Sequence, residues 1–352
     1  MKQTLGSYLI ATLEAQGVRH VFGIPGVHNL ELYRGLARSG IRHVTGRHEQ
    51  GLGFMADGYA RVSGRPGVCF TITGPGLGNI VTALGQAYGD SIPLLVISSA
   101  NRVAEIGTGR GFLHDMPDQL GVAARVTGSS ARISRPQELP EAVANAFATM
   151  TEGRPRPAYL EIPRDVLGAD AAGLPAPGPA ARAARPEAPV AAIAEAARQL
   201  RAARAPLILA GGGALGAVHE LRQLAELLDA PVVMTVNARG LLPPDHPLGV
   251  SMSPSLKAVR KLIADSDLVL AVGTELGQTD YDMYGTEEFR QPRNLLRIDI
   301  DATQLARTAR ASLALHADAA SALRAILSQE LASARVPTQA TRVAAACDGA
   351  RA

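Results

Sequence analysis

Three short segments of the sequence place glycine, proline or an acidic residue directly after an apolar, β-branched run. The segments are Gly23-Ile24-Pro25-Gly26-Val27-His28, Arg47-His48-Glu49-Gln50-Gly51 and Thr73-Gly74-Pro75-Gly76-Leu77-Gly78-Asn79. Glycine lets the main chain approach a flat ligand closely. The carboxyl group of Glu49 can accept and donate a proton, and the amide of Asn79 can hydrogen-bond near a reacting group. These residue types predict a site where backbone packs against a ligand and one carboxyl group does acid–base work.

Each segment on its own also has a structural interpretation. Turns between strands and helices use glycine and proline for their backbone geometry. An acidic residue such as Glu49 in the first turn of a helix is favoured by the helix dipole. The combination of all three segments within the first 79 residues favours a functional site.

Two histidines are further candidates, because a neutral imidazole can donate or accept a proton near physiological pH. His28 lies just beyond the first turn, and His114 lies in the loop Gly111-Phe112-Leu113-His114-Asp115. For both residues the alternative is a hydrogen-bonded structural histidine. His48, next to Glu49, is interpreted as structural.

Short apolar runs alternate with helical patterns along the chain, which predicts parallel sheets covered by helices on both faces. In the first half we expect strands at Val21–Ile24, Arg42–Thr45, Val68–Thr73, Leu94–Ser98 and Ala158–Ile162, helices near 28–38, 49–63, 78–88 and 137–150, and an amphipathic N-terminal helix with Leu5, Leu9 and Leu13. In the second half we expect strands at Leu207–Ala210, Val232–Val236, Leu268–Val272 and Leu295–Ile300 and helices near 190–203, 215–228 and 318–334. The predicted fold class is α/β, with two doubly wound parallel-sheet domains. Ligands of such sheets bind beyond the carboxyl ends of the strands, where the three segments lie.

The expected domain organisation is a first domain over 1–167, a linker over 168–189, a central domain over 190–335 and a tail over 336–352. The linker is rich in proline, alanine and glycine, so it cannot form a continuous helix or a central strand. The tail shows no strand pattern and little hydrophobic periodicity. We interpret it as the beginning of a second linker.

The composition excludes several other classes of protein. The chain has 352 residues, 47% of them hydrophobic, which is enough for two cores and excludes disorder as the main state. The net charge is +3, but the basic residues are scattered and only 4% of residues are aromatic, so no nucleic-acid partner is expected. No apolar run approaches the roughly 20 residues that span a bilayer, so no membrane partner is expected. The two cysteines are too few for a disulfide framework, which predicts a cytoplasmic protein.

A glycine-rich turn in the second domain suggests a different assignment. Gly211-Gly212-Gly213-Ala214-Leu215-Gly216 fits the G-x-G-x-x-G pattern of dinucleotide-binding turns. The acid expected after the next strand is missing, because Val236 is followed by Asn237. We therefore favour a turn that supports packing over a nucleotide site. Asp299 and Asp301 could contact a ribose or cap the turn that follows their strand.

The three segments, in this order and at this spacing, resemble the pyrimidine-binding domain of the thiamine diphosphate enzymes of the acetolactate synthase, pyruvate oxidase and 2-oxo acid decarboxylase type. The matching stretches are G-I-P-G at 23–26, R-H-E-Q-G at 47–51 followed by A-D-G-Y-A-R at 56–61, and T-G-P-G-L-G-N at 73–79. The resemblance covers essentially the whole chain, with a pyrimidine-binding type domain, a linker and a central Rossmann-like domain in the family's order. The run 23–33 and Leu241-Leu242-Pro243-Pro244 look most like the 5-guanidino-2-oxopentanoate decarboxylases.

The resemblance implies a cofactor, thiamine diphosphate, and a small 2-oxo acid substrate. It assigns cofactor binding to Pro25, Gly26, Glu49, Gly74, Pro75, Gly76 and Asn79, and catalysis to Glu49, His28 and His114. Glu49 would share a proton with the cofactor's aminopyrimidine, which prepares the thiazolium carbon to attack the substrate, and carbon dioxide leaves because the thiazolium ring accepts the electrons. His114 lies near the place where family members carry a glutamine or histidine facing the active site. FAD is bound by the central domain of some members, but it is not favoured here.

The family also uses a diphosphate-binding domain, in which a G-D-G motif and an asparagine hold Mg²⁺ and the phosphates. No such motif follows in this sequence, because Asp348-Gly349 lacks a preceding strand, so we expect this third domain to be absent and no metal ligand to come from this chain. Activity would then need that domain from elsewhere, for example on a separate subunit, and we expect a homodimer or tetramer. The alternatives are a non-catalytic binding or regulatory relative and a flavin- or nicotinamide-dependent oxidoreductase.

Overall fold

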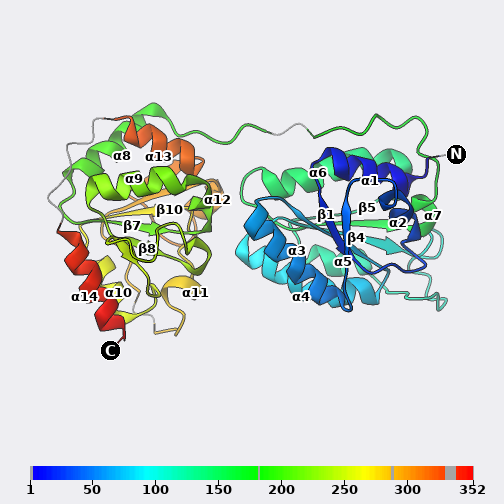
Figure 1. Cartoon of the computed structure of the whole chain (residues 1–352), viewed down its shortest axis with the longest axis horizontal. Coiled ribbons are helices and arrows are strands. Elements are labelled where there is room, and N and C mark those ends of the chain that lie inside the picture. Colours follow the sequence, from blue (N-terminus) through cyan, green and yellow to red (C-terminus); the bar gives the residue numbers. More distant parts are fainter. Residues whose placement is uncertain (1–2, 181–182, 287–288, 330–337, 352) are drawn as a thin grey trace. The chain divides into compact units, whose positions relative to one another are not determined.

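The computed structural model describes residues 3–180, 183–286, 289–329 and 338–351. The chain forms two compact units, Met1–Ala183 and Ala184–Ala352. Each unit contains a six-stranded sheet with helices on both of its faces (Figure 1). All the strand pairs of both sheets are parallel. The predicted fold class, two doubly wound α/β domains, is confirmed.

The first sheet has the strand order β2-β1-β3-β4-β6-β5. Its strands are β1 (His20–Gly23), β2 (Arg42–Thr45), β3 (Gly67–Thr71), β4 (Leu94–Ala100), β5 (Ser129–Arg132) and β6 (Ala158–Pro163). The sequence patterns predict five of them and miss β5. That strand has no apolar run, because it is a half-buried strand at the edge of the sheet with the sequence Ser-Ser-Ala-Arg.

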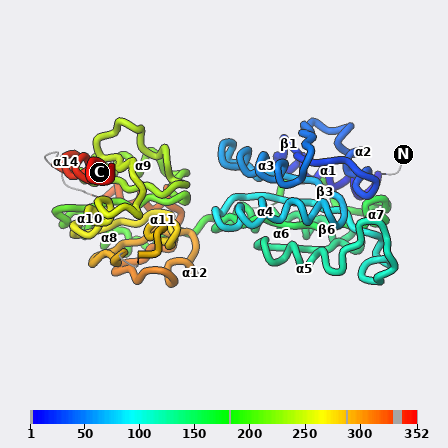
Figure 2. The backbone as a smooth tube through the Cα atoms, turned by 90° about the horizontal axis from the view of Figure 1, so that it is seen from below, coloured from blue at the N-terminus to red at the C-terminus, as the bar shows by residue number. Residues whose placement is uncertain are grey.

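The helices of the first unit form two layers, one on each face of the sheet (Figure 1), and Figure 2 is viewed from the side of one of these layers. The helices are α1 (Leu5–Ala15), α2 (Leu30–Leu36), α3 (Glu49–Ser63), α4 (Pro75–Asp90), α5 (Gln119–Ala124), α6 (Leu139–Thr151) and α7 (Arg164–Leu167). One core cluster joins the sheet to α1, α2, α6 and α7, and a second joins its other face to α3, α4 and α5. The predicted N-terminal amphipathic helix is confirmed, because Leu5, Leu9 and Leu13 are fully buried in the first cluster.

Local sequence explains where α3 begins and ends and where α4 begins. The His48 ring nitrogen Nδ1 accepts a hydrogen bond from the Gln50 N–H at 3.2 Å and caps α3. Gly64 ends α3 in the left-handed conformation. Pro75 occupies the first position of α4, where its missing N–H costs nothing. The expectation of a structural role for His48 is confirmed.

The second sheet has the strand order β12-β11-β10-β7-β8-β9. Its strands are β7 (Pro206–Ala210), β8 (Val232–Met234), β9 (Gly249–Val250), β10 (Leu268–Val272), β11 (Leu295–Asp299) and β12 (Leu313–His316). The sequence patterns predict four of them and miss β9 and β12, the two edge strands. The main helices are α8 (Val190–Ala202), α9 (Val218–Leu228), α10 (Lys257–Ala264), α13 (Ala319–Leu327) and α14 (Gln339–Arg351), with the short helices α11 (Gln278–Tyr281) and α12 (Ala302–Leu305).

The prediction that the tail begins a second linker is wrong, because Gln339–Arg351 forms helix α14. Val343, Ala346 and Cys347 are buried in the core cluster that also contains Leu262 and Ile263 of α10. The periodicity is weak because most of the other residues of the helix are small or polar. Residues 336–337 of the predicted tail, and residues 330–334 of the predicted helix 318–334, lie outside the described residues.

Much of the segment 168–189 is attached to one unit or the other. The Leu5 N–H donates to the Ala169 carbonyl at 2.9 Å, and the Tyr8 hydroxyl donates to the Pro175 carbonyl at 2.8 Å. On the side of the second unit, Arg185 forms an ion pair with Asp318. None of the described helices is long and apolar enough to cross a membrane.

Candidate active site

The three segments identified in the sequence meet at the carboxyl edge of the first sheet. They follow β1, β2 and β3, which are neighbours in the order β2-β1-β3. The turn after β1 is held by Asn29, which is fully buried. Its Oδ1 accepts from the Gly26 N–H at 2.8 Å, and its Nδ2 donates to the Ile24 carbonyl at 3.2 Å. The backbone of this turn is therefore fixed from inside the protein.

Glu49 and Asn79 are in direct contact. Glu49 is the first residue of α3 and is 7% exposed, and Asn79 lies in the first turns of α4. Asn79 Nδ2 donates to Glu49 Oε2 at 2.9 Å. The helices can approach because Gly53 of α3 faces Ala83 of α4, where an added Cβ would lie 2.5 Å from the Ala83 Cβ. The arrangement holds one carboxyl oxygen and leaves Oε1 without a described partner.

Both glycine turns pack against Ile72, and Gly26 is half-buried whereas Gly74 and Gly76 are buried. An added Cβ would lie 2.7 Å from Ile72 Cγ2 at Gly26 and 2.9 Å from Ile72 Cγ1 at Gly76. Pro25 and Pro75, the prolines of the two turns, are exposed. Two glycine turns with exposed prolines, next to a strand end that carries a buried carboxyl group, fit the aminopyrimidine of thiamine diphosphate. Among the described residues, no three His, Cys, Asp or Glu side chains lie together so as to hold a metal ion.

His28 and His114 come together although 86 positions separate them in the sequence. Their ring centroids lie 5.9 Å apart in an edge-to-face arrangement. His28 is 3% exposed, and its Nδ1 lies 2.8 Å from the Thr73 hydroxyl oxygen. Burial lowers the pKa of His28 below its usual value, and the positive charge of Arg164 and the nearby His114 lower it further. His28 is therefore a neutral imidazole at pH 7.

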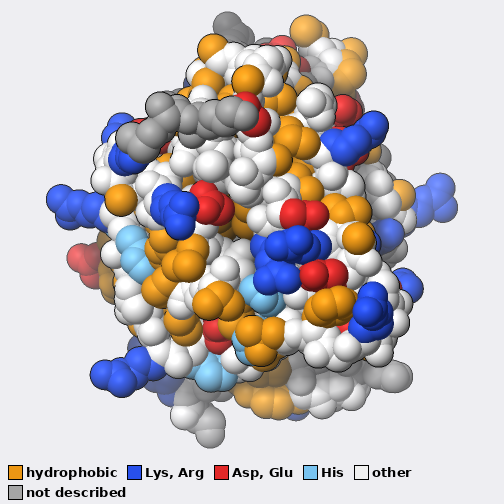
Figure 3. Space-filling view, turned by 90° about the vertical axis from the view of Figure 1, so that its right-hand side faces the viewer, with side chains coloured by type: hydrophobic (Ala, Val, Ile, Leu, Met, Phe, Trp, Pro, Cys, Tyr) orange, Lys and Arg blue, Asp and Glu red, His pale blue; other side chains and the backbone are white. Residues whose placement is uncertain are grey.

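Sequence reasoning missed three polar residues around this pair. Arg164 Nη2 donates to Glu105 Oε2 at 3.0 Å, and its charge acts on His28. Arg164 could have been found, because it comes two positions after the predicted strand 158–162, at the sheet's carboxyl edge. Glu105 and Gln119 belong to no recognisable pattern. Figure 3 shows basic side chains flanked by acidic ones, with histidines beside them, on one face of the molecule.

The glycine turn of the second unit has a packing role. The N–H groups of Gly211 and Gly213 donate to the carbonyls of Val272 and Gly273, both at 3.0 Å. An added Cβ at Gly213 would lie 2.8 Å from the Gly273 Cα. These amides are therefore engaged by the neighbouring strand-to-helix turn, and the interpretation of this turn as structural is supported.

The two acidic residues that follow β11 cap the turn after it. Asp301 accepts from the N–H groups of Thr303 and Gln304 at 2.9 and 3.2 Å, and Asp299 accepts from the Asp301 N–H at 2.9 Å. Of the two roles left open for these residues, the structure shows the capping role.

Comparison with known protein families gives two matches, one in each unit. Residues 3–122 match the N-terminal TPP binding domain of thiamine pyrophosphate enzymes, and residues 193–326 match the central domain of the same enzymes. The chain belongs to the thiamine pyrophosphate (thiamine diphosphate) enzyme family, whose N-terminal TPP binding domain and central domain it contains. The resemblance inferred from the three motifs is confirmed.

Individual relatives agree with this assignment. The chain is 49% identical over 324 residues to a probable 2-ketoarginine decarboxylase of Pseudomonas aeruginosa, covering 92% of this chain and 57% of the relative. It is 34% identical over 318 residues to the large subunit of acetolactate synthase isozyme 1 of Escherichia coli, covering 90% of this chain and 56% of the relative. A probable acetolactate synthase large subunit of Methanocaldococcus jannaschii is also 34% identical, over 336 residues, 92% of this chain and 56% of the relative. The chain spans just over half the length of the curated relatives it matches.

Proposed function

We propose that this chain supplies the pyrimidine-binding and central domains of a thiamine diphosphate-dependent enzyme acting on 2-oxo acids, as a decarboxylase or an acetolactate synthase-like enzyme. The observation that carries the proposal is the buried Glu49 carboxyl group at the start of α3, held by Asn79 at 2.9 Å beside two glycine turns. A diphosphate- and Mg²⁺-binding domain would complete the site, on the same polypeptide or on a separate subunit. We further propose a homo-oligomeric, cytoplasmic enzyme.

In this proposal Glu49 holds and moves one proton. Its Oε2 accepts from Asn79, so Oε1 is the oxygen that exchanges a proton with the ring nitrogen of the pyrimidine. The backbone of Gly26, Gly74 and Gly76, with Pro25 and Pro75, packs against the ring and orients it. When bound, thiamine diphosphate supplies the electron sink for carbon–carbon bond cleavage.

His28 and His114 act on the substrate in this proposal. His28 is neutral at pH 7 because burial and then the positive charge of Arg164 lower its pKa, so it can either donate or accept a proton. Its Nδ1 is occupied by the Thr73 hydroxyl at 2.8 Å, which leaves Nε2 for the substrate. The His114 ring lies edge-to-face with the His28 ring and presents a second imidazole to the same space. The pair can transfer protons to and from the carbonyl oxygen of a 2-oxo acid.

A cationic 2-oxo acid such as 5-guanidino-2-oxopentanoate is the substrate we favour. The relative named as a probable 2-ketoarginine decarboxylase shares more of its sequence with this chain than the acetolactate synthases do. Asp115, directly after His114, is half-buried, and its carboxylate has no described hydrogen-bond or ion-pair partner. An uncompensated carboxylate beside the proposed substrate space favours a substrate with a positive end.

The test is to measure activity after a diphosphate-binding domain has been added to the chain. The purified chain is mixed with thiamine diphosphate, Mg²⁺ and a polypeptide that carries a diphosphate-binding domain of this family. Carbon dioxide release is then measured with 5-guanidino-2-oxopentanoate and with pyruvate, and acetolactate is measured with pyruvate. We expect decarboxylation of the guanidino acid to be faster. Absence of turnover with every 2-oxo acid, together with no binding of the cofactor, would overturn the proposal.

A further inference from the structure

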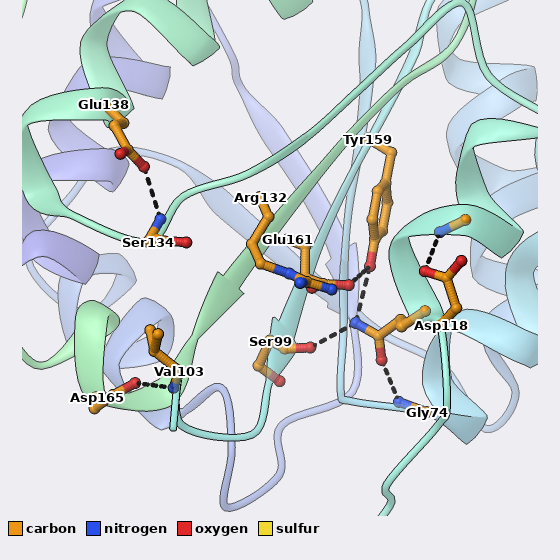
Figure 4. Close-up of polar contacts among 12 residues, drawn as sticks. Gly74, Ser99, Val103, Asp118, Arg132, Ser134, Glu138, Tyr159, Glu161 and Asp165 are labelled. Carbon is orange, nitrogen blue, oxygen red and sulfur yellow. Dashed lines mark hydrogen bonds and ion pairs between the residues drawn. The ribbon is translucent and has the colours of Figure 1, made fainter. Parts of the chain in front are cut away.

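The side-chain amide of Gln119 links three segments of the first unit. Gln119 is the first residue of α5 and is 4% exposed. Its Oε1 accepts from the Gly74 N–H at 2.6 Å, and its Nε2 donates to the Ser99 carbonyl at 3.0 Å and to the Tyr159 hydroxyl at 2.9 Å (Figure 4). The Gly74 N–H can only donate and the Ser99 carbonyl can only accept, so the orientation of the amide is determined.

The far side of this amide is anchored by buried charge. The Tyr159 hydroxyl donates to Glu161 Oε2 at 3.4 Å. Glu161 is fully buried and forms an ion pair with Arg132 on the neighbouring strand β5. Burial raises the pKa of Tyr159, and the Glu161 charge adds to this, so the phenol stays protonated. The Tyr159 proton can then be donated to Glu161 while its oxygen accepts from Gln119. Gln119 is thus held at its donor end by a fully partnered network.

At its acceptor end, Gln119 holds the turn after β3. Gly74 has φ +62°, and an added Cβ there would lie 2.3 Å from the His114 carbonyl oxygen. The turn and the loop that carries His114 are therefore in backbone contact. Gln119 lies five residues after His114, so one side chain ties the end of that loop to the turn it touches.

We propose that Gln119 is a positioning residue that fixes the backbone of the turn 73–76 and the adjoining His114 loop for cofactor and substrate. The proposal rests on the proposed function, because that function makes the turn and the loop parts of the cofactor and substrate site. The geometry has a consequence without any ligand: the Gly74 amide should be protected from solvent by the Gln119 oxygen.

The experiment measures hydrogen exchange of backbone amides by NMR on the labelled chain, without ligand. Gln119→Met keeps the length of the side chain and removes both hydrogen-bonding groups. Gln137→Met makes the same change at an exposed position of the same unit and serves as the matched control. Tyr159→Phe removes one partner of Gln119 and leaves the bond to Gly74. If Gln119→Met does not fold, Gln119→Asn withdraws the amide by one methylene and takes its place.

We expect exchange of the Gly74 amide to accelerate by about tenfold or more in Gln119→Met, while the amides of Cys69 and Phe70 in β3 keep their rates. Tyr159→Phe should change the Gly74 rate by less than about threefold, and Gln137→Met should leave it unchanged. An unchanged Gly74 rate in folded Gln119→Met overturns the proposal. An equal acceleration throughout β3 also overturns it, because Gln119 would then contribute only to general stability.

A second measurement connects the geometry to the cofactor. Thiamine diphosphate with Mg²⁺ is titrated into the wild-type chain and Gln119→Met, each mixed with a polypeptide that carries a diphosphate-binding domain, with the Gly26 and Gly76 amide signals as the readout. A loss of affinity of about tenfold in the variant supports the positioning role. Equal affinity overturns that role and leaves the cofactor assignment intact. If the wild-type chain binds no cofactor even in this mixture, the proposed function fails, and the exchange data still decide whether Gln119 fixes the turn.

Discussion

Asn79 Nδ2 donates a hydrogen bond to Glu49 Oε2 across 2.9 Å, and this contact joins the start of α3 to the start of α4. The two helices follow different strands of the first sheet, so the carboxyl group is held by a residue 30 positions away. Glu49 is also 7% exposed. An acidic residue whose only role in the first turn is to interact with the helix dipole would normally be exposed to water. Burial against a neutral amide therefore favours a functional role for Glu49.

Replacing the Glu49 carboxyl group should slow catalysis and leave the stability of the fold nearly unchanged. Glu49→Gln keeps the size of the side chain, so we expect the thermal unfolding midpoint to remain close to that of the wild type. In the enzyme completed with a diphosphate-binding domain, the rate of decarboxylation should fall by roughly 10²–10⁴-fold, the range of general acid–base catalysis. Glu31→Gln, at a carboxylate of α2 away from this contact, is the comparison. A completed Glu49→Gln enzyme with the wild-type rate would contradict the assignment.

His28 should make the stability of the first unit depend on pH. Its pKa is lowered from 6.5 in the folded chain by burial and then by the charges of Arg164 and His114. The unfolded chain therefore binds more protons as the pH falls below 6.5, and stability rises with pH in this window. The contribution of neutral His28 is complete above pH 6.5 and is lost as the pH falls toward the folded pKa.

Urea unfolding at pH 7.5 and pH 5.5 measures this dependence. His28→Asn should lose less stability between the two pH values than the wild type does. His219→Asn, at an exposed histidine of the second unit, should behave as the wild type. A pH dependence in His28→Asn as steep as that of the wild type would mean that other groups cause it.

Gly74 should tolerate no side chain. It has φ +62°, and an added Cβ would lie 2.3 Å from the His114 carbonyl oxygen. Gly74→Ala should lower the free energy of unfolding by about 1–3 kcal/mol. Gly78→Ala, four residues further along α4 where nothing lies within 4 Å of the added Cβ, should raise it by about 0.5–1 kcal/mol. Changes of opposite sign in the free energy of unfolding, measured by chemical denaturation, would confirm the prediction. Equal changes in the two variants would contradict it.

Gly213 in the second unit gives a parallel comparison. An added Cβ would lie 2.8 Å from the Gly273 Cα, whereas at Gly216 nothing lies within 4 Å. We expect Gly213→Ala to lower the free energy of unfolding of this unit by about 1–3 kcal/mol and Gly216→Ala to have little effect. Differential scanning calorimetry on the whole chain measures both. If Gly213→Ala is neutral, the turn does not have the packing role described above.

Helix α14 should contribute to the stability of the second unit. Val343 is 5% exposed in the core cluster shared with α10, and Ala345 on the same helix is exposed. Val343→Asp should destabilise the unit by roughly 2–4 kcal/mol, because it loses apolar burial and places a charge in the core. Ala345→Asp should change the free energy of unfolding by less than about 0.5 kcal/mol. Two equal unfolding curves would show that α14 does not pack as described.

The features predicted from the sequence are those determined by local patterns. The expected helix 49–63 coincides with α3, because a capping residue, an apolar stripe and Gly64 mark both ends. Strand β5 and helix α14 carry no strong pattern of their own, and they form because a neighbour covers them.

The same distinction applies to the site. Glu49 and the glycine turns stand out in the sequence because turn and cap chemistry is local. Gln119 has no local signal, since each of its partners lies at least 20 positions away. The pairing of His28 with His114 likewise depends on how β1 and the loop after β4 come together, which spacing alone does not reveal.

The contact between Gly213 and Gly273 has an evolutionary consequence. A Cβ added at Gly273 would lie 2.5 Å from the Gly213 Cα, and one added at Gly213 would lie 2.8 Å from the Gly273 Cα. Neither position can gain a side chain while the two turns keep their separation. Across relatives these two positions should therefore covary, with glycine retained at both or lost at both together with a wider spacing of β7 and β10 at this edge.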